Sequence, residues 1–180
     1  GKCALFKTFG NVDAYPLCIR SKDVEEIVRT VKLLAGSFGG VNLEDISAPR
    51  CFEIETRLQE ELDIPVFHDD QHGTAIVTAA ALLNAVKLAG KKMEDIYVVI
   101  NGAGAAGIAI AKFLTAFGVK DVVACSSKGI LAAGDARFNP AQQELAKITN
   151  KRRLTGGLEN AMKGADVFVG VSVANCVSKA

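Results

Sequence analysis

The hydrophobic positions of the chain alternate between short continuous runs and longer patterns with helical spacing. The run Tyr15–Ile19 predicts a strand, and apolar residues three and four apart over roughly residues 22–35 predict a helix. Ser21 stands at the N-cap position of this helix, and Gly36 follows its last apolar position. Further predicted strands are Gly39–Leu43, Ile64–Phe67, Ile96–Ile100, Val119–Cys125 and Val167–Val171. Further predicted helices are Pro49–Leu62, with Ser47 as its cap, and Thr74–Leu88, Ile108–Phe117, Pro140–Ile148 and Leu158–Lys163.

This alternation of strands and helices is typical of right-handed β-α-β units and predicts an α/β fold built on parallel sheets. The segment Thr74–Leu88 is apolar on all sides, which predicts a fully buried helix. After it, Gly90–Glu94 separates the helix from a fresh strand. We therefore expect two domains, residues 1–92 and residues 93–180.

Composition and charge narrow the function. The chain has 180 residues, of which 49% are hydrophobic, and a net charge of +1 without a charged block, so nothing favours nucleic acid or a membrane surface as a partner. The longest charge-free stretches, Gln71–Val86 and Ile96–Ala111, have 16 residues each and are too short to span a membrane. Five cysteines without a C-x-x-C pair argue against disulfides and structural zinc and indicate a reducing compartment, the cytoplasm or an organelle matrix. The chain opens without Met, as a piece of a longer chain would.

A glycine-rich loop follows the strand Ile96–Ile100. Gly102, Gly104 and Gly107 have the G-x-G-x-x-G spacing between a strand and an apolar helix, which is typical of dinucleotide binding. Gly102 makes the turn, Gly104 lets a pyrophosphate approach the backbone together with Ala105 and Ala106, and Gly107 permits close packing. The alternative is a glycine turn with a purely structural role.

The next strand ends at Ser126, Ser127 and Lys128, where many relatives of this fold place an acid that binds the adenosine ribose. Two hydroxyl groups and an ammonium suit a 2′-phosphate better than a free diol, so the sequence favours NADP over NAD. The alternative is a solvated loop.

Two pairs of acidic residues follow predicted strands. Glu44 and Asp45 come after Gly39–Leu43, and Asp69 and Asp70 come close behind Ile64–Phe67. The carboxyl ends of parallel strands meet at one edge of a sheet, so these four carboxylates should converge and bind Mg²⁺ or Mn²⁺. The alternative is that Asp45 and Asp70 cap the helices that follow. The isolated histidines His68 and His72 are not assigned as ligands.

Several segments together resemble one family, the malic enzymes in their small microbial form. The segments are Gly1–Lys2 near Phe6–Lys7, Asp13–Cys18, Phe38–Ile46, Pro65–Ala75 and Asn101–Gly107. The resemblance implies a substrate and metal domain followed by a Rossmann-type dinucleotide-binding domain. It also implies oxidative decarboxylation of L-malate to pyruvate with NADP or NAD and Mg²⁺ or Mn²⁺, by a homo-oligomer, a dimer.

The resemblance also assigns roles residue by residue. It makes Glu44, Asp45 and Asp70 the metal ligands and Asp69 a neighbouring acid that orients the site. Lys2 corresponds to the base that takes the proton of the malate C2 hydroxyl, a role that requires an amine with a depressed pKa.

The chain departs from the family pattern at both ends. No segment matches the Tyr-Thr-Pro sequence that carries the family's catalytic acid, and the chain stops before an Asn-Pro segment that holds the substrate. The resemblance therefore covers the interior of a malic enzyme and leaves the fold incomplete at both ends. Two rivals stay open: another Rossmann dehydrogenase with a similar two-domain plan, and a non-catalytic fragment that binds dinucleotide and metal.

Overall fold

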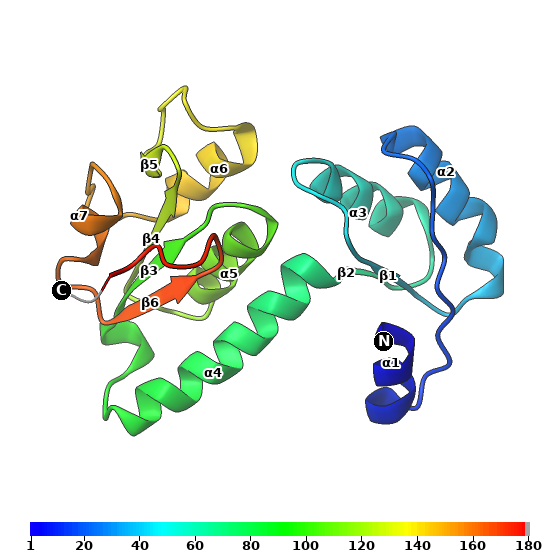
Figure 1. The fold of residues 1–180 in the computed structure, drawn as a ribbon, viewed down its shortest axis with the longest axis horizontal. Coiled ribbons are helices and arrows are strands. Elements are labelled where there is room, and N and C mark those ends of the chain that lie inside the picture. The colour runs from blue at the N-terminus through cyan, green and yellow to red at the C-terminus, as the bar shows by residue number, and fades with distance from the viewer. Residues whose placement is uncertain (179–180) are drawn as a thin grey trace.

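The computed structural model describes residues 1–178 and shows two lobes linked by one long helix (Figure 1). The first lobe contains α1 (Lys2–Gly10), α2 (Val24–Leu34), η1 (Ala35–Ser37), β1 (Val41–Leu43), α3 (Arg50–Glu61), β2 (Val66–His68) and the π-helical turn η2 (Asp69–Gly73). The linking helix is α4 (Thr74–Leu88). The second lobe contains η3 (Met93–Asp95), β3 (Tyr97–Asn101), α5 (Ala105–Ala116), β4 (Asp121–Ser126), β5 (Gly129–Ile130), α6 (Pro140–Ile148), α7 (Leu158–Met162) and β6 (Val167–Gly170).

The predicted α/β class is confirmed by two separate sheets. In the first lobe β1 pairs with β2 in parallel. In the second lobe the strand order is β5-β4-β3-β6, with β3 parallel to both β4 and β6. The short strand β5 is antiparallel to β4 and was not predicted, because two residues are too few to give a strand pattern. The parallel strands and the order around β3 are those of a Rossmann half, whose topological switch point lies between β3 and β6.

The central strand β3 explains why the second lobe is stable. Its residues Val98 and Ile100 face a core that includes Leu114 of α5, whereas Val99 faces the other side of the sheet and packs with Val123 and α7. Val98, Val99 and Ile100 have no exposed surface. A strand that is apolar on both faces is what a sheet covered on two sides requires.

The first lobe has its own small core. Ile27 and Val28 of α2 pack with Ile54 and Leu58 of α3 and with the two strands. Ile54 and Leu58 are completely buried. The register of β1 and β2, with Leu43 opposite His68, brings the carboxyl ends of both strands to one edge.

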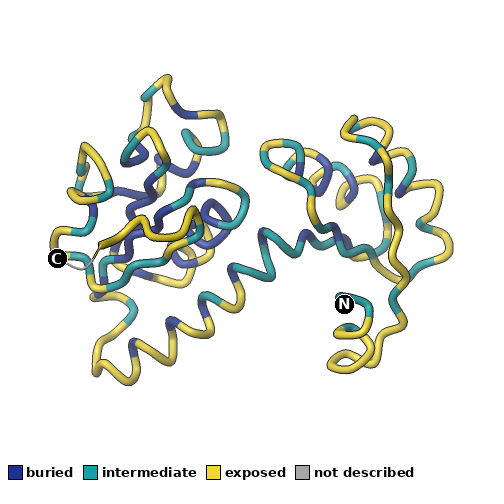
Figure 2. Tube along the Cα trace, viewed as in Figure 1, coloured by how far each residue is buried: buried dark blue, intermediate teal, exposed yellow. Residues whose placement is uncertain are grey.

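Helix α4 does not have the predicted all-round burial. It buries one stripe, Ala75, Ala79, Leu82 and Val86, in the same core as β3 and α5. Apolar side chains on its other sides are exposed, because no described element packs there (Figure 2). The predicted boundary between residues 92 and 93 stays a prediction, while the packing joins α4 to the core of the second lobe.

Other differences lie near the amino end. Residues 11–23 contain no regular element, so the strand predicted at Tyr15–Ile19 is wrong. The N-cap of α2 is Asp23, whose side chain accepts the Glu26 amide, rather than Ser21. Helix α3 begins after Pro49 without a side-chain cap, so Ser47 does not cap it. Helix α1 was not predicted, and it has no buried residue.

Two expectations about the chain as a whole can be compared with the described residues. None of the helices within residues 1–178 combines the length and apolar character needed to span a membrane. All five cysteines have free thiols.

Candidate active site

Three carboxylates meet where the strands of the first lobe end. Glu44 follows β1, and Asp69 and Asp70 form the start of η2 directly after β2. One oxygen of each of the three side chains lies within 4.8 Å of the others. The expected convergence of acids at one sheet edge is therefore seen for Glu44, Asp69 and Asp70.

Asp45 is not one of these three residues. Its backbone has a positive φ of 59°, and its amide donates a 2.9 Å hydrogen bond to Oδ2 of Asp70. Its backbone thus orients a neighbouring carboxylate, and its assignment as a metal ligand stays a prediction. The helix-capping alternative is not what the structure shows, since neither α3 nor α4 has a side-chain cap.

Lys2 lies beside two of the carboxylates. Its Nζ donates to Oδ2 of Asp69 at 2.5 Å and is 3.1 Å from Oε1 of Glu44. The hydrogen bonds to Asp69 and then Glu44 raise the pKa of Lys2 above its usual value. The expected depression of this pKa is therefore not found, because the ammonium is stabilised by two acids rather than desolvated.

The turn η2 sets the direction of the two aspartates. A side chain at Gly73 would collide with the carboxylate of Asp69, so the glycine leaves room for that side chain. Beneath the turn, His68 is fully buried, and its two ring nitrogens have no hydrogen-bond partner among the described residues. Its Nε2 is 3.9 Å from Oδ2 of Asp70.

This donor set fits a hard divalent cation. Three carboxylates within 4.8 Å of one another repel each other, and Lys2 supplies a single positive charge against them. Mg²⁺ and Mn²⁺ prefer carboxylate oxygens. The buried ring of His68, near Asp70, has no hydrogen-bond partner within residues 1–178, so the polar groups here are incompletely satisfied by the described part of the chain.

The glycine loop lies at the carboxyl end of β3. Gly102 has φ of 121°, which favours glycine, and its amide donates to the Cys125 carbonyl. Gly107 packs so closely on the Gly102 carbonyl that a side chain there would overlap it. Gly104 is the N-cap of α5 and has open space where a side chain would be.

The first turn of α5 is free to meet an anion. No side chain caps this helix, so the early amides of Ala105, Ala106 and Gly107 have no side-chain acceptor. Such a helix N-terminus, with its positive dipole end, favours phosphate. Gln142 of α6 donates to the Ala103 carbonyl at 2.9 Å and holds the loop from the other side.

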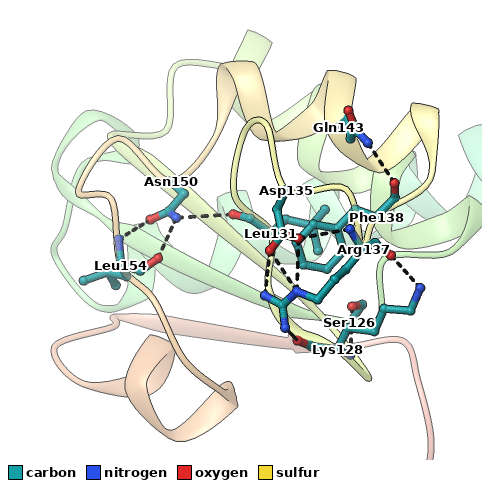
Figure 3. A network of polar contacts seen from close by, with 9 residues as sticks. All are labelled: Ser126, Lys128, Leu131, Asp135, Arg137, Phe138, Gln143, Asn150 and Leu154. Carbon is teal, nitrogen blue, oxygen red and sulfur yellow. Dashed lines mark hydrogen bonds and ion pairs between the residues drawn. The ribbon is translucent and has the colours of Figure 1, made fainter.

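The residues after β4 form a small polar network (Figure 3). The Ser126 hydroxyl accepts the Lys128 amide at 3.1 Å, and Nζ of Lys128 donates to the Arg137 carbonyl at 2.5 Å. Arg137 in turn donates to the Lys128 carbonyl and pairs with Asp135. The sequence interpretation missed Arg137, a second cation beside the loop of Ser126, Ser127 and Lys128. It carried no local signal because it follows Lys128 by nine positions in an irregular segment.

The carboxylates and the glycine loop are connected through one helix. Helix α5, which begins at the glycine loop, packs against both η2 and α4. A cavity of about 560 Å³ adjoins this contact and is lined by Phe67, His72, Lys112 and Phe113, among others, but by none of the three carboxylates. Helix α5 therefore joins the acidic turn to the glycine loop.

A Rossmann half with a glycine loop at the carboxyl edge of its sheet, together with an acidic cluster in the other lobe, is typical of the class of proteins that bind a dinucleotide. Comparison with protein families is more specific. The model described as "Malic enzyme, NAD binding domain" matches residues 71–177, and the model described as "Malic enzyme, N-terminal domain" matches residues 19–59. The chain belongs to the malic enzyme family.

Individual relatives agree with this assignment. The chain is 58% identical over 180 residues to the bifunctional malic/malolactic enzyme of Bacillus subtilis, covering 99% of this chain and 44% of that protein. It is 48% identical over 182 residues to a probable NADP-dependent malic enzyme of Rickettsia prowazekii, covering 99% of this chain and 23% of that protein. The crystal structure of an NAD-dependent malic enzyme from Thermotoga maritima superposes with a TM-score of 0.94 at 54% identity, covering 98% of this chain and 48% of that chain. The chain thus spans less than half the length of these relatives.

Proposed function

We propose that the chain carries the metal and dinucleotide centre of an enzyme that converts L-malate, with NAD(P), into pyruvate, carbon dioxide and NAD(P)H. The proposal is carried by one observation: the carboxylates of Glu44, Asp69 and Asp70 cluster next to Lys2, on a turn that packs against the helix of the glycine loop. This juxtaposition supports a cation and a nicotinamide hydride acceptor that act on the same substrate.

The positions of the protein groups support a role for each of them. Glu44 and Asp70 would hold Mg²⁺ or Mn²⁺. The third ligand would be Asp45, as the resemblance implies, or Asp69, which lies in the carboxylate cluster. A cation held there would supply Lewis acidity at the oxygen on C2 of the substrate, and a bound dinucleotide would supply the acceptor for hydride from C2. Asp69 holds Nζ of Lys2 beside the carboxylates. Its two acidic partners favour the ammonium form, so Lys2 would have to lose a proton before it could take that of the C2 hydroxyl, and a cation bound to Glu44 and Asp70 would favour this loss.

We propose that the groups of the glycine loop and of the loop after β4 select the cofactor. The amides at the start of α5 would bind the pyrophosphate, and Ser126, Ser127 and Lys128 would contact the adenosine ribose or its 2′-phosphate. These donors, with Arg137 nearby, support NADP as the preferred cofactor, although relatives named for NAD and for NADP are both similar to this chain. The homodimer and the cytoplasmic location stay predictions.

The proposal can be tested by following reduced nicotinamide and pyruvate in the presence of L-malate, NADP or NAD, and Mn²⁺. We expect equimolar pyruvate and reduced cofactor, and a loss of turnover in Lys2→Ala with little change in Mn²⁺ affinity. Binding of both Mn²⁺ and dinucleotide without malate turnover would instead support the non-catalytic binding fragment. Turnover that is indifferent to Mn²⁺ and chelators would favour a different Rossmann dehydrogenase.

A further inference from the structure

A buried carboxylate on α3 lies behind the acidic turn. Glu55 is 6% exposed, and its helix is anchored in the first core by Ile54 and Leu58. A carboxylate removed from water is strongly destabilised unless donors surround it. The groups that donate hydrogen bonds to Glu55 should therefore be held in place by it.

Three donors surround this carboxylate, and all three come from the segment that carries Asp69 and Asp70. The His68 amide donates to Oε1 at 3.0 Å, and Nε2 of Gln71 donates to Oε2 at 3.0 Å. Nε2 of His72 lies 2.8 Å from Oε1 and 3.0 Å from Oε2. Because a carboxylate only accepts, that nitrogen must carry the hydrogen.

The donors bracket the two aspartates in sequence. His68 precedes Asp69, and Gln71 and His72 follow Asp70, so a single side chain fixes both ends of the acidic pair. The turn between them is a five-residue π-helix, a conformation with weak intrinsic preference. It also has to hold Asp69 and Asp70 close to Glu44 against mutual repulsion. The local backbone cannot supply that fixation alone.

We propose that Glu55 is a positioning residue that preforms the divalent-cation site by fixing η2 from behind. This inference rests on the proposed metal site, and it assigns to Glu55 no contact with the cation or the substrate. Its oxygens are occupied by the three donors of the turn, and it is not part of the carboxylate cluster.

The central test compares Glu55→Gln with a control on the same helix. Gln59 is one turn further along α3, and its Nε2 donates to the Val66 carbonyl at 3.0 Å without a hydrogen bond to η2. Gln59→Ala therefore removes a link between α3 and β2 but leaves the turn attached. Both variants and the parent are titrated with Mn²⁺ by electron paramagnetic resonance, and their melting temperatures are measured.

We expect Glu55→Gln to weaken Mn²⁺ binding by about tenfold to a hundredfold, the usual effect of losing a group that orients a metal ligand. Gln59→Ala should bind Mn²⁺ as the parent does. In the metal-free protein, amide hydrogen exchange should accelerate at residues 68–73 in Glu55→Gln and stay unchanged there in Gln59→Ala.

Each outcome has a separate meaning. A parent that does not bind Mn²⁺ refutes the proposed metal site, while the hydrogen exchange still decides whether Glu55 fixes the turn. A parent that binds Mn²⁺ and a Glu55→Gln variant that binds equally well overturn the positioning role, as does equal weakening in Gln59→Ala. If Glu55→Gln does not fold, Glu55→Asp replaces it, and unchanged Mn²⁺ affinity in that shorter carboxylate overturns the proposal.

Discussion

The substitution Gly104→Ala separates the cofactor role of the glycine loop from its structural role. A methyl group at this position would meet no protein atom within 4 Å, and the backbone φ of −90° suits any L residue. Replacing an N-cap glycine by alanine costs at most about 1 kcal/mol. The lower entropy of the unfolded chain returns about 0.4–1 kcal/mol. The melting temperature should therefore change little.

The expected effect on binding is much larger. The space that is open in the protein is where a pyrophosphate would approach the uncapped amides of α5. A methyl group there would hold the phosphate away from at least one amide. Losing one hydrogen bond to a charged group corresponds to about 1.5–3 kcal/mol, or roughly a tenfold to 150-fold increase in Kd.

The assay is a fluorescence titration with NADPH and with NADH, paired with calorimetric melting. Gly39→Ala is the matched control, because a methyl there also meets open space, in the other lobe. Gly107→Ala should lower the melting temperature, unlike Gly104→Ala, because its methyl would overlap the Gly102 carbonyl. A Gly104→Ala variant that melts normally and binds both nucleotides like the parent would refute the assignment of this loop.

Three further predictions concern other groups. Asp70→Asn should weaken Mn²⁺ binding by more than tenfold, about 1.4 kcal/mol, since an anionic ligand is lost; unchanged calorimetric binding would contradict the site. Ser126→Asp should shift preference towards NAD, and Lys128→Ala should weaken NADP alone, each by about 1–2 kcal/mol; an unaltered ratio of the two Kd values would leave the loop without a cofactor role. Burial raises the pKa of Cys125 to about 11. The stabilisation of the folded protein by the neutral thiol should therefore be complete below about pH 9 and be lost as the pH rises towards 11. A folded Cys125 that reacts with iodoacetamide near pH 8 as fast as the exposed Cys18 would contradict this.

The fold could be predicted where burial follows a simple period. The runs that became β3 and β4 are buried on both faces, and a continuous apolar run is their direct signature. Helix α4 shows the limit of the same reasoning, because Ile76, Val77 and Leu88 are apolar but exposed. An all-apolar pattern indicates that every side of a helix could be buried. Whether each side is buried depends on which other elements pack against it, and the local pattern does not show this.

The candidate site was predictable at the level of strand ends but not of individual roles. Glu44, Asp69 and Asp70 converge because two apolar runs end next to acids and pair in parallel. Asp45 is outside the cluster and has a positive φ, a backbone state that its neighbours in sequence did not indicate. Glu55 had no signal either, since its partners lie 13 to 17 positions away on a different element.

The continuity between η2 and α4 has a consequence for the modular use of this chain. The turn η2 runs directly into α4, whose buried stripe belongs to the core of the second lobe. Glu55 of α3 binds the same turn to the first lobe. No cut between β1 and the end of α4 leaves both halves with their native neighbours. A chimera of two relatives that exchanges the second lobe should therefore take the acidic turn, Glu55 and α4 from the same parent.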